Sequence, residues 1–153
     1  MNEVLAAEAI QRMSVESTVF IAAPRARVYQ ALVHEVDAWW VKPYRMAEDS
    51  RALILEPNVG GRLYEPWGEG EEGVLWATVT SLRRNEWIEL TGKIGMRGPV
   101  FGIVWIELEE QDGATVVRLY HQAFGDLQPE TEKNYTEGWK FLLGSLKQVV
   151  EAK

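Results

Sequence analysis

The chain has 153 residues and a net charge of −7, with 46% hydrophobic and 25% charged residues. A chain of this length can bury roughly 70% of its unfolded surface, so one core is expected. The acidic balance excludes nucleic acid as an expected partner, because phosphate backbones are bound by clustered Lys and Arg. No segment approaches the roughly 18 unbroken apolar residues of a membrane span, and without cysteine no disulfide or thiolate metal site can form.

The N-terminal 13 residues carry Glu3 and Glu8 and lack the basic and apolar pattern of a signal peptide. We therefore expect a cytoplasmic protein, with residues 1–13 forming a short arm or helix ahead of a domain at 14–153.

The first elements expected in the domain are a strand, a helix and a short helix. Segment 14–22 is rich in β-branched and aromatic residues, which predicts a strand. Pro24 can begin a helix, because its fixed φ and missing N–H are tolerated at the first helical position, and this helix should reach about Glu35. A second short helix can occupy 36–40 and must end before Pro43.

The middle of the chain alternates short apolar runs with Gly, Asn and Pro, which is typical of consecutive hairpins. No helix long enough for a parallel crossover intervenes, so the sheet should be antiparallel, with about seven strands including the first. The strands expected here are 52–56, 62–67, 74–82, 87–91, 100–110 and 114–124.

After Pro129 the apolar residues recur with helical spacing, which predicts one long amphipathic helix from about Glu130 to Glu151. Its apolar face must lie on a large apolar surface, and the sheet is the only partner of sufficient size. The sequence therefore predicts an α+β fold in which a seven-stranded antiparallel sheet packs on the C-terminal helix.

Alternation along the strands assigns side chains to the two faces of the sheet. Charged and Thr residues mark the outer face, so the residues expected inside include Leu75, Leu90, Ile106, Leu119 and His121. Their neighbours on the outer face are aromatic: Trp76, Trp87, Trp105 and Tyr120. Such a patch favours a symmetric homodimer through these four residues.

The helix residues Tyr135 and Trp139 should form one wall of an apolar cavity opposite the inward-facing sheet residues. Trp40 should stand near the mouth of this cavity. Trp39 and Trp40, followed by Tyr44, can be either core residues that seat the short helices or the rim of a pocket, and the same two alternatives apply to Tyr135 and Trp139. The predicted ligand-binding residues are Trp40, Leu75, Leu90, Ile106, Leu119, His121, Tyr135 and Trp139.

Motifs for catalysis, metals and cofactors are missing or out of context. Gly68–Gly73 matches G-x-G-x-x-G, but it precedes a strand and carries three carboxylates, which favours a loop between strands over a nucleotide site. His34 and His121 lack metal-ligand spacing, and no nucleophile signature occurs. No catalytic residue, metal or cofactor is predicted. His121 is either a residue of the cavity wall whose hydrogen bonds are made to a neighbour or to water, or a group that orients a ligand or transfers a proton.

Several short phrases occur along the chain in a fixed order and spacing. They are Phe20-Ile21-Ala22-Ala23-Pro24-Arg25, Ala31-Leu32, Trp39-Trp40, Gly60-Gly61-Arg62, Gly113-Ala114-Thr115, His121 with Phe124-Gly125, and Gly138-Trp139 with Leu142-Leu143. This ordered set resembles the SRPBCC (START-like) superfamily over about Ser14 to Lys153, and most closely its bacterial branch similar to the heat-shock-protein-90 ATPase activator homologue.

This resemblance implies a helix-grip fold, in which the C-terminal helix closes a cavity formed by a curved sheet and two small helices. Members of the superfamily bind apolar molecules, and some are enzymes. Three functions therefore remain open: binding of a small apolar or amphipathic molecule, an enzyme that uses His121 or a cavity carboxylate, and a protein-interaction or stress-response module of the chaperone-activator-like type.

Overall fold

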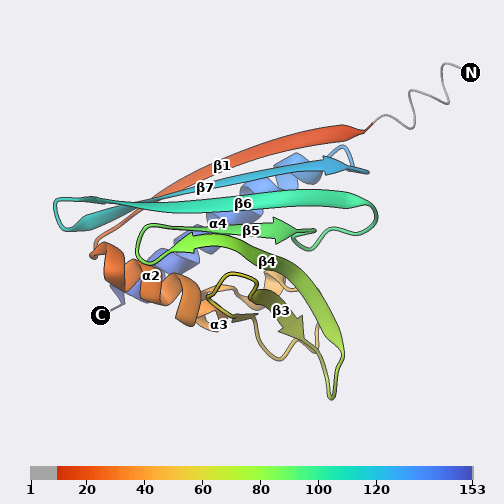
Figure 1. The fold of residues 1–153 in the computed structure, drawn as a ribbon, viewed down its shortest axis with the longest axis horizontal. Coiled ribbons are helices and arrows are strands. Elements are labelled where there is room, and N and C mark those ends of the chain that lie inside the picture. Colours follow the sequence, from red (N-terminus) through yellow and green to blue (C-terminus); the bar gives the residue numbers. More distant parts are fainter. Residues whose placement is uncertain (1–9, 153) are drawn as a thin grey trace, which may run out of the picture.

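The computed structural model describes residues 10–152 and contains a curved sheet, two short helices and a long C-terminal helix (Figure 1). In chain order its elements are β1 (Gln11–Ile21), α2 (Arg25–His34), α3 (Val36–Trp39), the 3-10 helix η1 (Lys42–Tyr44), β2 (Ile54–Leu55), β3 (Arg62–Pro66), β4 (Gly73–Arg83), β5 (Trp87–Gly92), β6 (Val100–Gln111), β7 (Ala114–Gly125) and α4 (Thr131–Glu151).

The seven strands form one antiparallel sheet in the order β1-β7-β6-β5-β4-β3-β2. Strands β2 to β7 follow one another as hairpins, and β1 joins the sheet beside β7. Helix α4 runs behind the sheet in Figure 1. The predicted fold class, with its seven strands and long C-terminal helix, is confirmed. Strand β1 begins at Gln11, and most of the arm expected at 1–13 lies outside the described residues.

Helix α4 buries the side of the helix that the apolar spacing predicted. Leu143 and Leu146 are at most 1% exposed, and Trp139, Leu142 and Val150 are almost as deeply buried. Burying one such leucine contributes about 1.5–3 kcal/mol relative to leaving it in water. The hydrophobic core therefore lies between α4 and the inner face of the sheet.

Helix α4 also covers the free edge of β1 with polar side chains. The Lys147 ammonium donates to the Phe20 carbonyl at 2.6 Å, and a Glu151 carboxylate oxygen accepts from the Ala22 amide at 2.7 Å. Near the other end of β1, Glu132 accepts from the Ser14 amide at 3.3 Å. These groups satisfy backbone atoms that an edge strand otherwise leaves unpaired.

A β-bulge in β4 overturns the predicted orientation of two side chains. Leu63 pairs with Ala77 and Tyr64 pairs with Leu75, so Trp76 is an extra residue between them. The bulge turns the Trp76 ring to the inner side, where it is 5% exposed, and leaves Leu75 53% exposed. The prediction that Leu75 faces the cavity and Trp76 the outside is therefore wrong.

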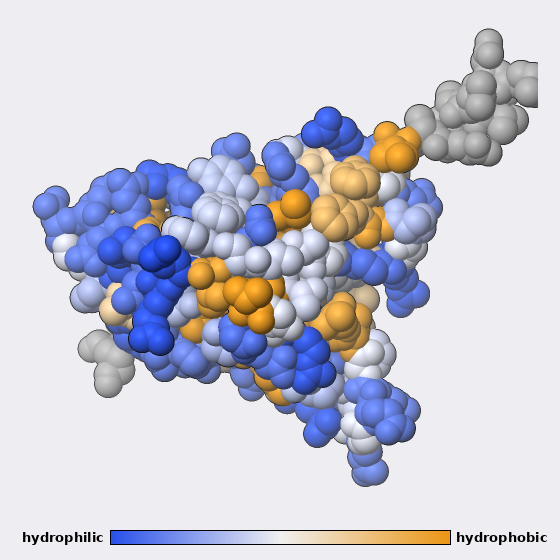
Figure 2. Space-filling model, in the orientation of Figure 1, coloured by the Kyte–Doolittle hydropathy of each residue, from blue (hydrophilic) through white to orange (hydrophobic). Residues whose placement is uncertain are grey.

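The other outer-face aromatics lie where alternation placed them. Trp87, Trp105 and Tyr120 are half-buried on the face away from α4, and the rings of Trp87 and Trp105 stack at 5.5 Å. Figure 2, in the orientation that puts α4 behind the sheet, shows apolar patches among hydrophilic residues. Within residues 10–152, no helix has the length and apolarity to cross a membrane.

Candidate functional site

A pocket of about 270 Å³ opens between η1, the N-terminal half of α4 and the turn that follows β5. This volume is near the lower end of the roughly 300–1,000 Å³ of ligand pockets. The lining is mostly aromatic and aliphatic, with few polar groups. Its residues are Trp40, Pro43, Tyr44, Arg45, Trp76, Ile94, Asn134, Tyr135, Gly138, Trp139 and Leu142.

Three indole rings meet at the inner side of the pocket. The ring of Trp40 meets Trp76 at 5.0 Å and Trp139 at 5.6 Å, both edge to face. The Trp40 Nε1 donates to the Tyr44 carbonyl at 2.9 Å, which ties the ring to η1. Aromatic contacts of this kind contribute about 0.5–1.5 kcal/mol beyond area burial. The pocket therefore has a preformed aromatic wall.

Glu65 on β3 holds part of this wall from behind. Its carboxylate is fully buried and accepts hydrogen bonds from the indole nitrogens of Trp76 at 2.9 Å and Trp67 at 2.8 Å. It also accepts from the backbone amides of Met46 at 3.0 Å and Ala47 at 3.2 Å. The four donors stabilise a buried carboxylate and connect the segment after η1 to the Trp76 ring.

Arg45 fixes the rim beside η1. Its Nε donates to the Trp40 carbonyl at 2.8 Å, and its Nη2 pairs with the Asp37 carboxylate at 2.9 Å. The same Asp37 oxygen accepts from the Leu53 amide at 2.9 Å. Although Arg45 lines the pocket, its guanidinium is therefore engaged by the protein.

The turn after β5 forms the opposite rim and is strained. Ile94 is 1% exposed and has φ +50°, a conformation that a β-branched residue rarely adopts. The Tyr135 hydroxyl donates to the Ile94 carbonyl at 2.7 Å, and the Ile94 amide donates to the Trp76 carbonyl at 3.0 Å. Gly95 lies against the Trp76 ring, where an added Cβ would come within 2.4 Å.

His121 lies one layer behind the pocket wall. Its side chain is fully buried, and its Nδ1 accepts a hydrogen bond from the Trp139 Nε1 at 2.9 Å. Its ring meets the Tyr135 ring edge to face at 5.2 Å. Burial lowers the pKa of His121 from 6.5 to about 4 and raises the pKa of Tyr135 to about 12, so both are neutral near pH 7.

The structure brings together only part of the predicted site. Trp40, Tyr135 and Trp139 line the pocket, and His121 contacts two of them. The inward orientation of Leu90, Ile106 and Leu119 is observed, but they are buried in the core and do not line the pocket. Leu75 is on the outer face.

Sequence reasoning assigned three important lining residues, Trp76, Ile94 and Gly138, to no part of the site. The bulge reverses the predicted face of Trp76, and Ile94 lies between the strand predicted at 87–91 and the turn at 95–99. Gly138 packs against Tyr44, with the Tyr44 ring 3.4 Å from where a Gly138 Cβ would stand. The sequence signal for Gly138 is its place in the apolar face of the predicted helix, because a glycine there indicates a close approach of another side chain or a space beside the helix.

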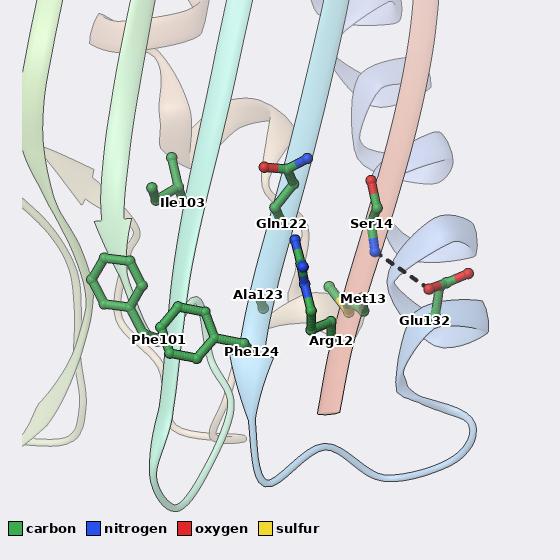
Figure 3. A pocket seen from close by; sticks show the side chains of 9 residues that line it. All are labelled: Arg12, Met13, Ser14, Phe101, Ile103, Gln122, Ala123, Phe124 and Glu132. Atoms are coloured by element: carbon green, nitrogen blue, oxygen red, sulfur yellow. Dashed lines mark hydrogen bonds between the residues drawn. The ribbon is translucent and has the colours of Figure 1, made fainter. Parts of the chain in front are cut away.

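A second hollow, of about 510 Å³, lies at one end of β1, β6 and β7 (Figure 3). The Phe101 and Phe124 rings, 5.5 Å apart, lie on one side of it, and Arg12 and Gln122 lie beside them. These phenyl rings are 43% and 47% exposed. The rings of Trp40, Trp76 and Trp139 are at most 5% exposed and so form a fixed wall, which makes the pocket beside α4 the better candidate.

The described residues 10–152 contain no group of His, Cys, Asp or Glu that could hold a metal ion. The Gly68–Gly73 motif connects β3 to β4 and opens no helix, as its sequence context predicted.

Comparison with known proteins places the chain in a family. The family model for the Activator of Hsp90 ATPase homolog 1-like protein matches residues 22–151. None of the curated proteins searched matches the sequence.

Solved structures share the fold at low sequence identity. An uncharacterized protein from Rhizobium leguminosarum is 18% identical, with a TM-score of 0.68 over 95% of this chain and 98% of that one. Mll3558 from Rhizobium loti is 17% identical, with a TM-score of 0.68 over 91% and 97%. Ara h 8.0201 is 15% identical, with a TM-score of 0.67 over 95% and 100%. The chain has the helix-grip fold and belongs to the Activator of Hsp90 ATPase homolog 1-like family.

Proposed function

We propose that this protein binds a small apolar or amphipathic molecule in the pocket between α4, η1 and the Ile94 turn, in the cytoplasm. The observation that carries the proposal is the preformed wall of Trp40, Trp76 and Trp139 around a space of about 270 Å³. Rigid aromatic walls supply contact area without the entropy cost of ordering flexible side chains.

The polar groups at the pocket support a neutral occupant. The Arg45 guanidinium is paired with Asp37, and the Glu65 carboxylate behind the wall accepts hydrogen bonds from four donors. Neither charge is free to balance a charged ligand, and burying an unpaired charge is costly. The same engagement leaves no carboxylate positioned as a general base, which favours binding over catalysis.

A fluorescence titration with the neutral dye N-phenyl-1-naphthylamine tests this function. We expect saturable binding to the wild type and loss of binding in Gly138→Leu, because the new side chain would press on the Tyr44 ring and occupy part of the pocket that both residues line. Gly144→Leu is the matched control, since the same change on the same helix meets nothing within 4 Å. No binding to the wild type, or equal binding to both variants, would contradict the proposal.

We also propose a symmetric homodimer through the outer face of the sheet, using Trp87, Trp105 and Tyr120. The stacked Trp87 and Trp105 rings give this face a flat aromatic centre, and a two-fold contact would cover the same patch on both copies. Sedimentation equilibrium tests it: Trp87→Lys should shift the wild-type dimer to monomer. A wild type that stays monomeric at high concentration rules the dimer out.

A further inference from the structure

We propose that the pocket has a deeper, polar end at His121, closed here by the Ile94 turn, and that its occupant carries one uncharged hydrogen-bond acceptor such as a ketone, ester or ether oxygen. This inference rests on the proposed binding function and names the chemical class of its ligand.

The first support is an unsatisfied donor. Because the Nδ1 of His121 accepts from Trp139, the neutral ring must carry its proton on Nε2. This Nε2 is buried and has no hydrogen-bond partner among residues 10–152. Buried polar groups are satisfied in the great majority of cases, and one left without a partner costs stability. An acceptor atom on a ligand would remove this cost.

The second support is position. Tyr135 and Trp139, whose rings meet the His121 ring, also line the pocket, so His121 stands directly behind this part of the pocket wall. On the sheet side the Nε2 lies near Gly102: a Cβ added there would stand 3.4 Å from the nitrogen and 3.1 Å from the Gly92 carbonyl oxygen. The glycine therefore keeps a side chain away from the nitrogen.

The third support is a barrier that can open. The Ile94 backbone is held in a conformation that stores strain, and a hydroxyl from Tyr135 latches its carbonyl. Strained residues persist where the surroundings over-determine them and gather at ligand clamps. Releasing this hydrogen bond, together with the one from the Ile94 amide to the Trp76 carbonyl, would let the turn relax and widen the pocket on its inner side.

The chemistry at this end selects the acceptor. The groups seen beside His121 include the Trp139 indole, the Tyr135 ring, Gly102 and the Gly92 carbonyl, and none of these carries a charge near pH 7. An anion would lack a counter-charge, and a cation would meet a donor. A neutral oxygen is the partner that a buried N–H can bind without leaving a charge unbalanced.

A matched pair of naphthalenes tests the inference by displacing N-phenyl-1-naphthylamine. The compound 2-acetylnaphthalene carries a carbonyl, and 2-isopropylnaphthalene has nearly the same shape without it. We expect the ketone to bind wild type about fivefold to tenfold more tightly, the worth of one hydrogen bond, and His121→Phe to abolish the preference. Equal wild-type affinities would overturn the inference and leave the binding function standing, whereas binding of neither naphthalene nor dye would mean that the binding function itself fails.

A second measurement covers the case in which His121→Phe does not fold, since Trp139 loses its acceptor there. The infrared carbonyl stretch of ¹³C-labelled 2-acetylnaphthalene should move to lower frequency when bound to wild type, as it does on accepting a hydrogen bond. Tyr135→Phe, which keeps the His121 donor and removes the latch, should show the same stretch and faster association. A bound stretch at its value in hexane would overturn the inference.

Discussion

The indole nitrogen of Trp76 donates a hydrogen bond of 2.9 Å to the buried carboxylate of Glu65, so a charge in the core fixes a ring of the pocket wall. Glu65 also holds the backbone after η1, so one side chain connects that segment to the Trp76 ring of the pocket wall. Both the stability of the protein and ligand binding in the pocket should therefore depend on Glu65.

Replacing Glu65 by Gln should lower the free energy of unfolding by about 3 kcal/mol. The amide places an NH₂ group against one of the N–H donors that a carboxylate accepts, and hydrogen bonds to charged groups contribute about 1.5–3 kcal/mol each. Urea denaturation measures the loss. Glu56→Gln is the control, because Glu56 pairs with Arg62 at the surface and should change little. A Glu65 variant as stable as the wild type would show that the four donors contribute nothing net.

Gly95→Ala and Gly98→Ala should differ sharply although both glycines have nearly the same positive φ, +83° and +82°. At Gly98 the new Cβ meets nothing within 4 Å, so only the backbone cost of about 1–2 kcal/mol applies. At Gly95 it would stand 2.4 Å from the Trp76 ring, and overpacking adds about 1–3 kcal/mol.

Thermal unfolding and N-phenyl-1-naphthylamine titration check this pair. The Gly95 variant should also bind the dye more weakly, because the ring that it displaces lines the pocket. Equal effects of the two substitutions would show that the turn does not press on Trp76.

Burial of His121 should make the protein less stable as the pH falls from 6.5 to 4. The folded-state pKa, about 4, is below the ordinary value of 6.5, so between these values the unfolded chain binds a proton that the folded protein does not. The full pKa shift corresponds to a loss of about 3 kcal/mol in the free energy of unfolding. This loss is absent above pH 6.5 and complete below pH 4. Protonation would also place a second N–H against the Trp139 donor.

Urea denaturation across this range should show the extra loss in wild type but not in His121→Phe, with carboxylate titration common to both. The exposed second histidine provides the control, since His34→Gln should keep the wild-type profile. Parallel profiles for wild type and His121→Phe would contradict a neutral, buried His121.

Gly144→Ala should stabilise the protein by about 0.5–1 kcal/mol. This glycine lies inside α4, has nothing within 4 Å of an added Cβ, and loses more conformational freedom on folding than alanine does. Gly138→Ala on the same helix should gain less, because its Cβ meets the Tyr44 ring at 3.4 Å. Thermal melts of the two variants measure the difference.

Most of the fold could be predicted because its signals are local. Turn residues between short apolar runs located the strands, and helical spacing located α4 within a residue of its observed start at Thr131. These signals depend only on residues that are close in the sequence, so they hold whatever the arrangement of the strands in the sheet.

The pocket could not be predicted in full because its geometry depends on departures from regular structure. Alternation assumes an unbroken strand, and the bulge at Trp76 exchanges the faces of Leu75 and Trp76 with no glycine or proline at the bulge to indicate it. A charged residue ordinarily marks the outer face of a strand, whereas Glu65 is buried among four donors, two of which are backbone amides 18 and 19 residues away. The positive φ of Ile94 runs against the preference of its residue type.

The polar side chains that α4 places along β1 constrain how the pocket can open. If α4 swung away from the sheet, Lys147 and Glu151 would leave the Phe20 carbonyl and the Ala22 amide bare. An 11-residue strand with a bare edge is a template on which other chains can add, the first step of aggregation. A ligand that entered by lifting the helix would thus expose the edge of β1 to aggregation at every binding event. Entry past Ile94 would leave this edge covered by α4.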